Sequence, residues 1–227
     1  MIEVKDLKKD YHLGEETVHA LAGVSLELEK GEFAAFVGPS GSGKSTLLHL
    51  IGGLDTPSSG SIVVEGKDLS RAGDKDLAQY RNSNVGFVFQ SFHLHPTYNA
   101  LENVAIPLIF SGVAKADRLT RAKAALEAVG MGHRAGHLPN QLSGGERQHV
   151  SIARALVTEP SIIVADEPTG NLDTANGSRI MELLGNLNSE KNITLMVATH
   201  DAELARRARR VITMRDGLIT GDKHENQ

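Results

Sequence analysis

The sequence of 227 residues carries 24 lysines and arginines against 28 aspartates and glutamates, a formal net charge of -4 at pH 7. This balance argues against a general electrostatic attraction to nucleic acid or acidic lipid, so we expect no nucleic acid among its partners. The absence of cysteine excludes disulfides and thiolate chemistry, and no stretch approaches the roughly 20 apolar residues of a membrane-spanning helix.

The first third of the chain is predicted to form strands. Residues 2–7 (IEVKDL) and 24–29 (VSLELE) alternate apolar and polar side chains, which is typical of a strand with one buried face. Residues 61–66 (SIVVEG) follow a turn-rich stretch and have the same character. Residues 32–37 (EFAAFV) form a short apolar run that also indicates a strand.

A glycine- and serine-rich stretch, GPSGSGKST, follows this last strand. It fits the pattern G-x-x-x-x-G-K-[ST], and residues 45–54 continue with apolar side chains at helical spacing. Strand, glycine loop and helix in this order predict a phosphate-binding loop, because glycines let successive N–H groups turn toward an anion and the helix adds its positive N-terminus. The alternative, a flexible linker, needs no such flanking elements. The loop comprises Gly38, Pro39, Ser40, Gly41, Ser42, Gly43, Lys44, Ser45 and Thr46.

The middle of the chain, residues 101–156, has the pattern of helices. Residues 116–130 are amphipathic and close on Gly130, a plausible C-terminal glycine, and residues 145–157 form a second helical stretch. Strand patterns precede and follow this region, at 85–90, 161–168, 193–200 and 210–217. Strands that alternate with helices around a phosphate-binding loop predict an α/β fold with a mostly parallel core sheet.

Polar side chains stand where three of these strands end. Asp166 and Glu167 end the apolar run SIIVA, His200 ends ITLMVAT, and Gln90 ends VGFVF. Ligands bind at the carboxyl ends of the strands in such sheets. With Ser45 of the loop, Asp166 and Gln90 are therefore candidate Mg²⁺ ligands, and Glu167 and His200 are candidates to activate water. The alternative for the acids is a solvated strand end, which the nearby phosphate loop disfavours.

The stretch LSGGERQ, at residues 142–148, offers a second anion-binding arrangement, because a serine and two glycines open a helix. At this point the sequence resembles the ATP-binding cassette (ABC) family, whose signature motif is LSGGQ. GPSGSGKST, VFQ, LSGGE, IIVADEPTGNLD and ATHD occur in the order and at the distances typical of that family. The resemblance extends over essentially the whole chain.

The resemblance implies a P-loop NTPase fold in one domain, residues 1–227, with an N-terminal antiparallel β subdomain and an inserted helical subdomain. The core and the β subdomain would occupy about 1–90 and 160–227, and the helical subdomain about 91–159. It also implies ATP hydrolysis with ATP and Mg²⁺ as cofactors, at the cytoplasmic face of the inner membrane. A second copy of the chain and integral membrane permease subunits would be the partners.

Individual roles follow from the same resemblance. Lys44 and Ser45 would hold phosphates and Mg²⁺, Gln90 would be the Q-loop residue, and Asp166 the Walker B acid. Glu167 would be the general base and His200 the switch histidine. Ser143, Gly144 and Gly145 would form the signature that closes over ATP bound to the second copy. Asp173 would be the D-loop acid, and Tyr11 would stack on adenine. A single tyrosine so near the N-terminus could equally belong to the core.

The chain also looks similar to one branch of the family, that of lipoprotein-release, macrolide-export and cell-division cassettes, to judge from VGFVFQSFHL, PTYNALENVAIPL and ADEPTGNLD. The branch implies a cassette that dimerises around two ATP molecules and drives a membrane partner in export, lipoprotein release or mechanotransmission. The alternative is a cell-division type, which regulates a membrane protein without transport. The sequence departs from the common signature at Glu146 and His149, which leaves the Ser-Gly-Gly unit intact.

Two other functional classes are less consistent with the sequence. Cassette ATPases that act on DNA or ribosomes carry coiled coils, zinc modules or a second cassette, and this chain has no heptads and no cysteines. A P-loop GTPase or kinase would not explain LSGGE, and the guanine-reading N-K-x-D is absent.

The segment after Gln90 is the predicted docking site for a helix of the membrane partner. It supplies more apolar side chains than a connecting loop needs, and Phe92 and His95 are the positions at which a charge is expected to abolish coupling. The apolar residues are Phe92, Leu94, Leu101, Val104 and Ile106. Most of the leucines and valines are expected in the core, and the remainder, on the side of Gln90, is expected to form the groove.

Overall fold

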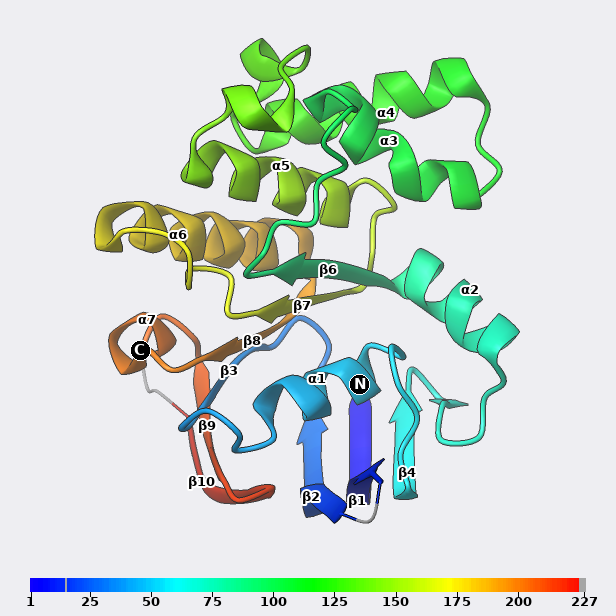
Figure 1. Cartoon of the computed structure of the whole chain (residues 1–227), viewed down its shortest axis with the longest axis vertical. Coiled ribbons are helices and arrows are strands. Elements are labelled where there is room, and N and C mark those ends of the chain that lie inside the picture. The colour runs from blue at the N-terminus through cyan, green and yellow to red at the C-terminus, as the bar shows by residue number, and fades with distance from the viewer. Residues whose placement is uncertain (15, 225–227) are drawn as a thin grey trace.

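The computed structural model describes residues 1–14 and 16–224. Its centre is a six-stranded sheet with the strand order β10-β9-β3-β8-β7-β6 (Figure 1). The neighbouring pairs from β9 through β6 are parallel, and β10 runs antiparallel to β9. The strands are β3 (Phe33–Val37), β6 (Val85–Phe89), β7 (Ile162–Asp166), β8 (Thr194–Thr199), β9 (Arg210–Arg215) and β10 (Leu218–His224).

The predicted mostly parallel core sheet is confirmed. All side chains of the central strand β8 are buried, as expected where helices cover both faces of a parallel sheet. No strand is predicted from the sequence after residue 217, yet β10 pairs with β9 through the turn Asp216-Gly217. Both turn residues have positive φ, 50° and 73°, which suits a tight hairpin.

A second sheet, antiparallel throughout, has the order β2-β1-β4-β5 (Figure 1). The predicted alternation holds: Ile2 and Val4 of β1 are buried against the interior, whereas Lys5 is exposed. The N-terminal antiparallel subdomain is thus confirmed, with β1 and β2 longer than predicted. The strands are β1 (Ile2–Leu13), β2 (Glu16–Leu28), β4 (Ser59–Val64) and β5 (Lys67–Asp68).

Helix α1 (Lys44–Ile51) lies between the two sheets. Its apolar side chains are at most 1% exposed and share one core with Ile2 of β1 and Phe36 of β3. Burial between two sheets fixes the direction of α1, so the loop before it stands at the carboxyl end of β3. The side chains concerned are Leu47, Leu48, Leu50 and Ile51.

A layer of helices covers the other face of the core sheet (Figure 1). The predicted helical middle is confirmed, and α4 ends before Gly130, whose φ of 75° suits a terminal glycine. This layer contains α3 (Ala100–Phe110), α4 (Lys115–Ala128), α5 (Gly144–Leu156) and α6 (Thr174–Lys191), with short 3-10 turns at Gly132–Arg134 and Pro139–Gln141.

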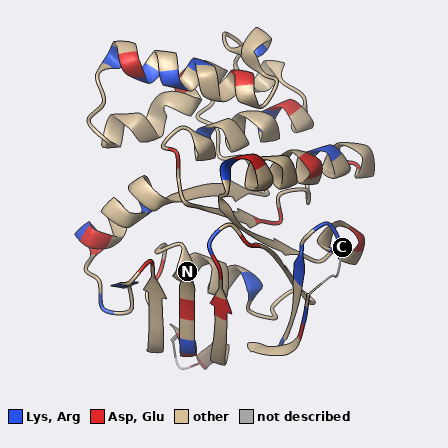
Figure 2. Cartoon of the chain, turned by 180° about the vertical axis from the view of Figure 1, so that it is seen from behind, with Lys and Arg blue, Asp and Glu red and all other residues tan. Residues whose placement is uncertain are grey.

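Three helices had not been predicted: α6, α2 (Asp74–Asn84) and the short α7 (Ala202–Ala205). Charged residues of both signs are interspersed on the outer helices, as α4 illustrates (Figure 2). Within residues 1–14 and 16–224, no helix combines the length and the apolar character needed to cross a membrane.

Candidate active site

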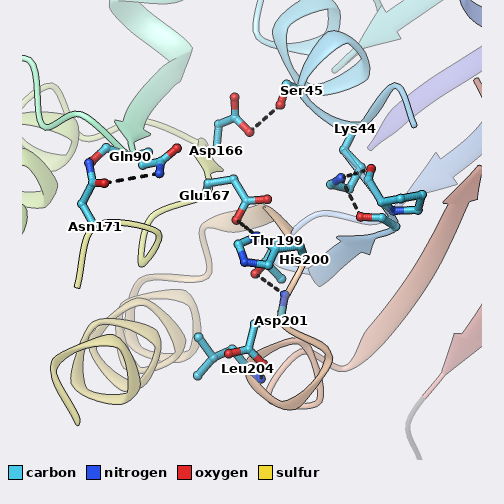
Figure 3. Close-up of polar contacts among 12 residues, drawn as sticks. Lys44, Ser45, Gln90, Asp166, Glu167, Asn171, Thr199, His200, Asp201 and Leu204 are labelled. Carbon is cyan, nitrogen blue, oxygen red and sulfur yellow. Dashed lines mark hydrogen bonds and ion pairs between the residues drawn. The ribbon is translucent and has the colours of Figure 1, made fainter. Parts of the chain in front are cut away.

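The glycine-rich loop joins β3 to α1, as predicted. Gly43 has a φ of 97°, and a Cβ atom there would lie 2.6 Å from the carbonyl oxygen of Ala20, so only glycine is accommodated. Lys44 is 6% exposed, and its ammonium donates to the carbonyl oxygens of Gly38 at 2.8 Å and Pro39 at 2.9 Å (Figure 3). Two carbonyl groups of the loop thus hold the ammonium group of Lys44 in place.

A cavity of about 790 Å³ opens over this loop. Polar groups from three separate strand ends enter it, namely Gln90 after β6, Glu167 after β7 and His200 after β8. These residues are predicted from the sequence at the carboxyl ends of the strands, and the fold brings them into one cavity with the loop. The other lining residues are Tyr11, Val18, His19, Ala20, Ser40, Gly41, Ser42, Gly43, Lys44, Ser45 and Thr46.

Asp166, the last residue of β7, lies against the start of α1. The Ser45 hydroxyl donates to Asp166 Oδ1 at 2.7 Å (Figure 3). His49 Nε2 lies 3.3 Å from Asp166 Oδ2. Burial opposes ionisation of this carboxyl, but the contacts with His49 and Ser45 and the charge of Lys44 hold its pKa below the ordinary value. Asp166 is therefore an anion at neutral pH. His49 was not identified from the sequence.

Glu167 has a strained backbone and a fixed side chain. Its φ is 48°, a conformation that is uncommon outside glycine, and its N–H donates to the carbonyl oxygen of Ala198 at 2.9 Å. The carboxylate Oε2 lies 2.9 Å from His200 Nδ1 (Figure 3). The turn directs Glu167 toward the cavity, beside the loop that would hold a phosphate chain.

Gln90 is tied to the loop that follows Glu167. Its Nε2 donates to Asn171 Oδ1 at 3.4 Å, and Asn171 Nδ2 donates to the Gln90 carbonyl oxygen at 3.0 Å (Figure 3). This mutual contact leaves the Gln90 amide oxygen available to a ligand in the cavity. Asn171 belongs to the motif IIVADEPTGNLD, but no pattern in the sequence indicates its contact with Gln90.

Tyr11 lies at the rim of the cavity, 37% exposed, rather than in the core. Its hydroxyl donates to Asp55 Oδ2 at 3.0 Å, and the ammonium of Lys9 lies 4.9 Å from the centre of the ring. Lys9 in turn donates to Asp55 Oδ1 at 2.7 Å. Burial and then the neighbouring Asp55 raise the pKa of Tyr11, so the ring stays neutral. Lys9 and Asp55 were missed because their contact spans 46 residues.

The signature stretch lies at the N-terminus of α5 and does not line this cavity. Ser143 caps the helix: its hydroxyl accepts from the Glu146 N–H at 3.2 Å, and Glu146 Oε2 accepts from the Ser143 N–H at 2.8 Å. The hydrogen bond from the Ser143 backbone lowers the pKa of Glu146, so the unusual glutamate strengthens the cap as an anion. Gly144, Gly145 and Asp173, the N-cap of α6, also lie outside the cavity lining.

Fold and site together define a P-loop nucleotide-binding protein with a second glycine motif, capped by Ser143, at the start of α5. Residues 21–170 match the family model described as "ABC transporter". The lipoprotein-releasing system ATP-binding protein LolD of Shewanella frigidimarina is 48% identical over 96% of this chain and 92% of that protein. The macrolide export ATP-binding/permease protein MacB of Rhodopirellula baltica is 47% identical over 98% of this chain, which spans 33% of that longer protein.

A solved structure of the ATP-binding cassette MJ0796, dimeric and bound to ADP and Pi, superposes with a TM-score of 0.92 at 42% identity over the full length of both chains. The chain belongs to the ABC transporter family. It is the ATP-binding cassette of that family, an ATPase that converts ATP and water to ADP and phosphate. The resemblance to the ABC family, the predicted α/β fold and the predicted ATPase activity are confirmed.

Proposed function

We propose that two copies of this chain close head to tail around two ATP molecules and that this closure drives a membrane partner in export or lipoprotein release. The observation that carries the proposal is the separation of Ser143 from the cavity of its own chain. The N-terminus of α5 is exposed at Ser143 and its N–H groups favour an anion, so a phosphate bound to a second copy would fit there. The dimeric cassette MJ0796 is consistent with such pairing.

Within each site, the residues of the cavity divide the chemistry. The backbone of the loop and Lys44 bind the phosphates, and Glu167 accepts the proton of the attacking water. His200 Nδ1, 2.9 Å from Glu167 Oε2, orients the carboxylate. The amide oxygen of Gln90 contacts the attacking water or the metal ion. Ser143 of the second copy approaches the γ-phosphate from the opposite side.

The donor set beside the loop fits Mg²⁺. Ser45 Oγ, the ionised Asp166 and the Gln90 amide oxygen are oxygen ligands, which this hard cation prefers. When bound, Mg²⁺ would neutralise charge on the phosphate oxygens. The Ser45 hydroxyl now donates to Asp166, so both ligands already face the same point.

Tyr11 would present its ring to adenine, since an aromatic face stacks on a base. Replacing Tyr11 with Ala is expected to weaken ATP binding by about 1–3 kcal/mol, roughly 5- to 150-fold in Kd, with little change in kcat at saturating ATP. Titration with ATP in the Glu167→Gln background measures Kd without turnover. Val18→Ala, at another rim position of the cavity, is the control. An unchanged Kd for Tyr11→Ala would contradict stacking on adenine and leave this tyrosine with a structural role alone.

A second cavity, of about 610 Å³, suits the membrane partner. It lies between β6 and the helices α2, α3 and α5, and Phe110 at its edge is 78% exposed. Arg154 of α5 also lines it and donates to the carbonyl oxygens of Phe92 and His93, just after Gln90. A partner helix seated in this groove would therefore contact the backbone that leads to the ATP site.

The groove differs in detail from the sequence prediction. Of the five apolar residues named for this segment, Ile106 lines the groove, and Val104 is in the core, as expected for most of its leucines and valines. Phe92 lies under the guanidinium of Arg147, at 5.2 Å, and His95 stacks on Tyr98 at 4.3 Å. Neither Phe92 nor His95 is in the lining, whereas His93 is; residues 92 and 93 both have positive φ.

Substituting Phe110 by Glu is expected to abolish co-purification with the permease and partner-stimulated ATP hydrolysis, while basal hydrolysis by the isolated protein stays unchanged. The reason is that a carboxylate would be desolvated in an apolar groove. Ile109→Glu is a matched control, since Ile109 is 50% exposed on the same helix but does not line the groove. Equal losses in both variants, or none in Phe110→Glu, would place the docking site elsewhere. With this docking, the protein would work as a peripheral subunit at the cytoplasmic face of the inner membrane.

A further inference from the structure

Gln148, on helix α5, joins two functional strand ends through its side chain. It is 0% exposed, and its Nε2 donates to the carbonyl oxygen of Pro168 at 2.5 Å and to that of Phe89 at 3.3 Å. Phe89 directly precedes Gln90, and Pro168 directly follows Glu167. One amide group therefore holds the backbone next to both residues.

The other half of this amide has no partner. Gln148 Oε1 is buried without a hydrogen bond among the described residues. A buried oxygen in this state costs stability, which an apolar side chain of similar volume would not. Packing alone therefore does not account for a glutamine here, whereas the two hydrogen bonds from Nε2 do.

The C-terminal part of α5 packs closely against β6. A Cβ atom at Gly86 would collide with the carbonyl oxygen of Ala155, near the C-terminus of the helix. The helix thus contacts the beginning of β6 through Gly86 and its end through Gln148. At the same end, Asn171 joins Gln90 to the loop after Glu167. A shift of α5 would move the carbonyls of both strand ends together.

We propose that Gln148 is a positioning residue for ATP hydrolysis, which keeps Gln90 and Glu167 in register with each other and with α5. The inference rests on the proposed function, since it takes Glu167 as the base. Ser143 opens the same helix. In the proposed dimer, Ser143 closes on the ATP bound to the second copy, whereas Glu167 acts on the ATP bound to its own chain. The hydrogen bonds of Gln148 therefore connect the two ATP sites.

The test replaces Gln148 by Leu, which has a similar volume and no donor. The expected result is a kcat lower by about 10- to 100-fold, the effect of a small misplacement of reacting groups, with an unchanged Kd for ADP. The matched control is Asn188→Leu. Asn188 is 3% exposed and its Nδ2 donates to the carbonyl oxygens of Gly31 and Ile193, which precede β3 and β8 at the amino ends of these strands, opposite the ends that reach the cavity. Thermal unfolding should show a similar loss of stability in both variants.

A loss of kcat confined to the Gln148 variant supports the positioning role. An unchanged kcat, an equal loss in Asn188→Leu, or a rise in Kd that matches the fall in kcat overturns it. Gln148→Met, with a flexible side chain, is compared in the same way if the leucine variant does not fold. Glu167→Gln measured alongside separates the two hypotheses: full activity there contradicts the proposed function, whereas its loss together with a normal Gln148→Leu contradicts only the positioning role.

Discussion

Replacing Glu167 by Gln is expected to lower the rate of ATP turnover by about 10²- to 10⁴-fold, the usual contribution of a general base. The amide has nearly the shape of the carboxylate but cannot accept the proton of water. Asp166 and the phosphate loop are untouched, and a contact with His200 at 2.9 Å remains possible. ATP should therefore still bind.

The same variant should collect as ATP-bound dimers, because hydrolysis is the step that opens the pair. Phosphate release measures turnover, and sedimentation with ATP and Mg²⁺ measures association. Glu203→Gln, an exposed carboxylate on α7 close to His200 in the sequence, serves as the control for the loss of one charge. Near-normal turnover in Glu167→Gln would remove this residue from the role of base.

Replacing Ser143 by Arg is expected to abolish hydrolysis with little effect on nucleotide binding by the single chain. Ser143 lies outside the cavity of its own chain, so the bulky cation would obstruct only the approach to a second copy's phosphate. The change also removes a helix cap, at about 0.5–2 kcal/mol. Asn99→Arg controls for that loss, since Asn99 caps α3 with the same reciprocal bonds and is not among the residues that line the cavity.

Mixing the Ser143 variant with Lys44→Ala tests whether the signature acts across the pair. The lysine variant should bind nucleotide more weakly, since a charge-assisted contact contributes roughly 1.5–3 kcal/mol. If the signature serves the other chain's ATP, a mixed dimer contains one intact site, and some activity returns. If it serves its own chain, both sites stay defective. High activity of the Ser143→Arg protein alone would contradict the assignment across the dimer.

The elements that could be read from the sequence are those with a strong local pattern. The apolar runs of β3, β7 and β8 and the loop at 38–46 were recognisable, because burial of a strand and curling of a glycine loop each need particular residues in direct succession. Helix α6 was missed although Ile180, Leu184 and Leu187 follow helical spacing, since glycines and asparagines interrupt it. Its stability comes from packing on the sheet.

The chemical identity of the site was thus already contained in local motifs: a loop for phosphates, two acids after a buried strand, and a second glycine motif at a helix start. Tertiary structure decided which side chains hold these groups in place. Asp55 against Tyr11, His49 against Asp166 and Gln148 under the strand ends are contacts between distant parts of the chain. No short-range pattern specifies such pairs, because their partners are chosen by how the sheets and helices pack rather than by spacing along the sequence.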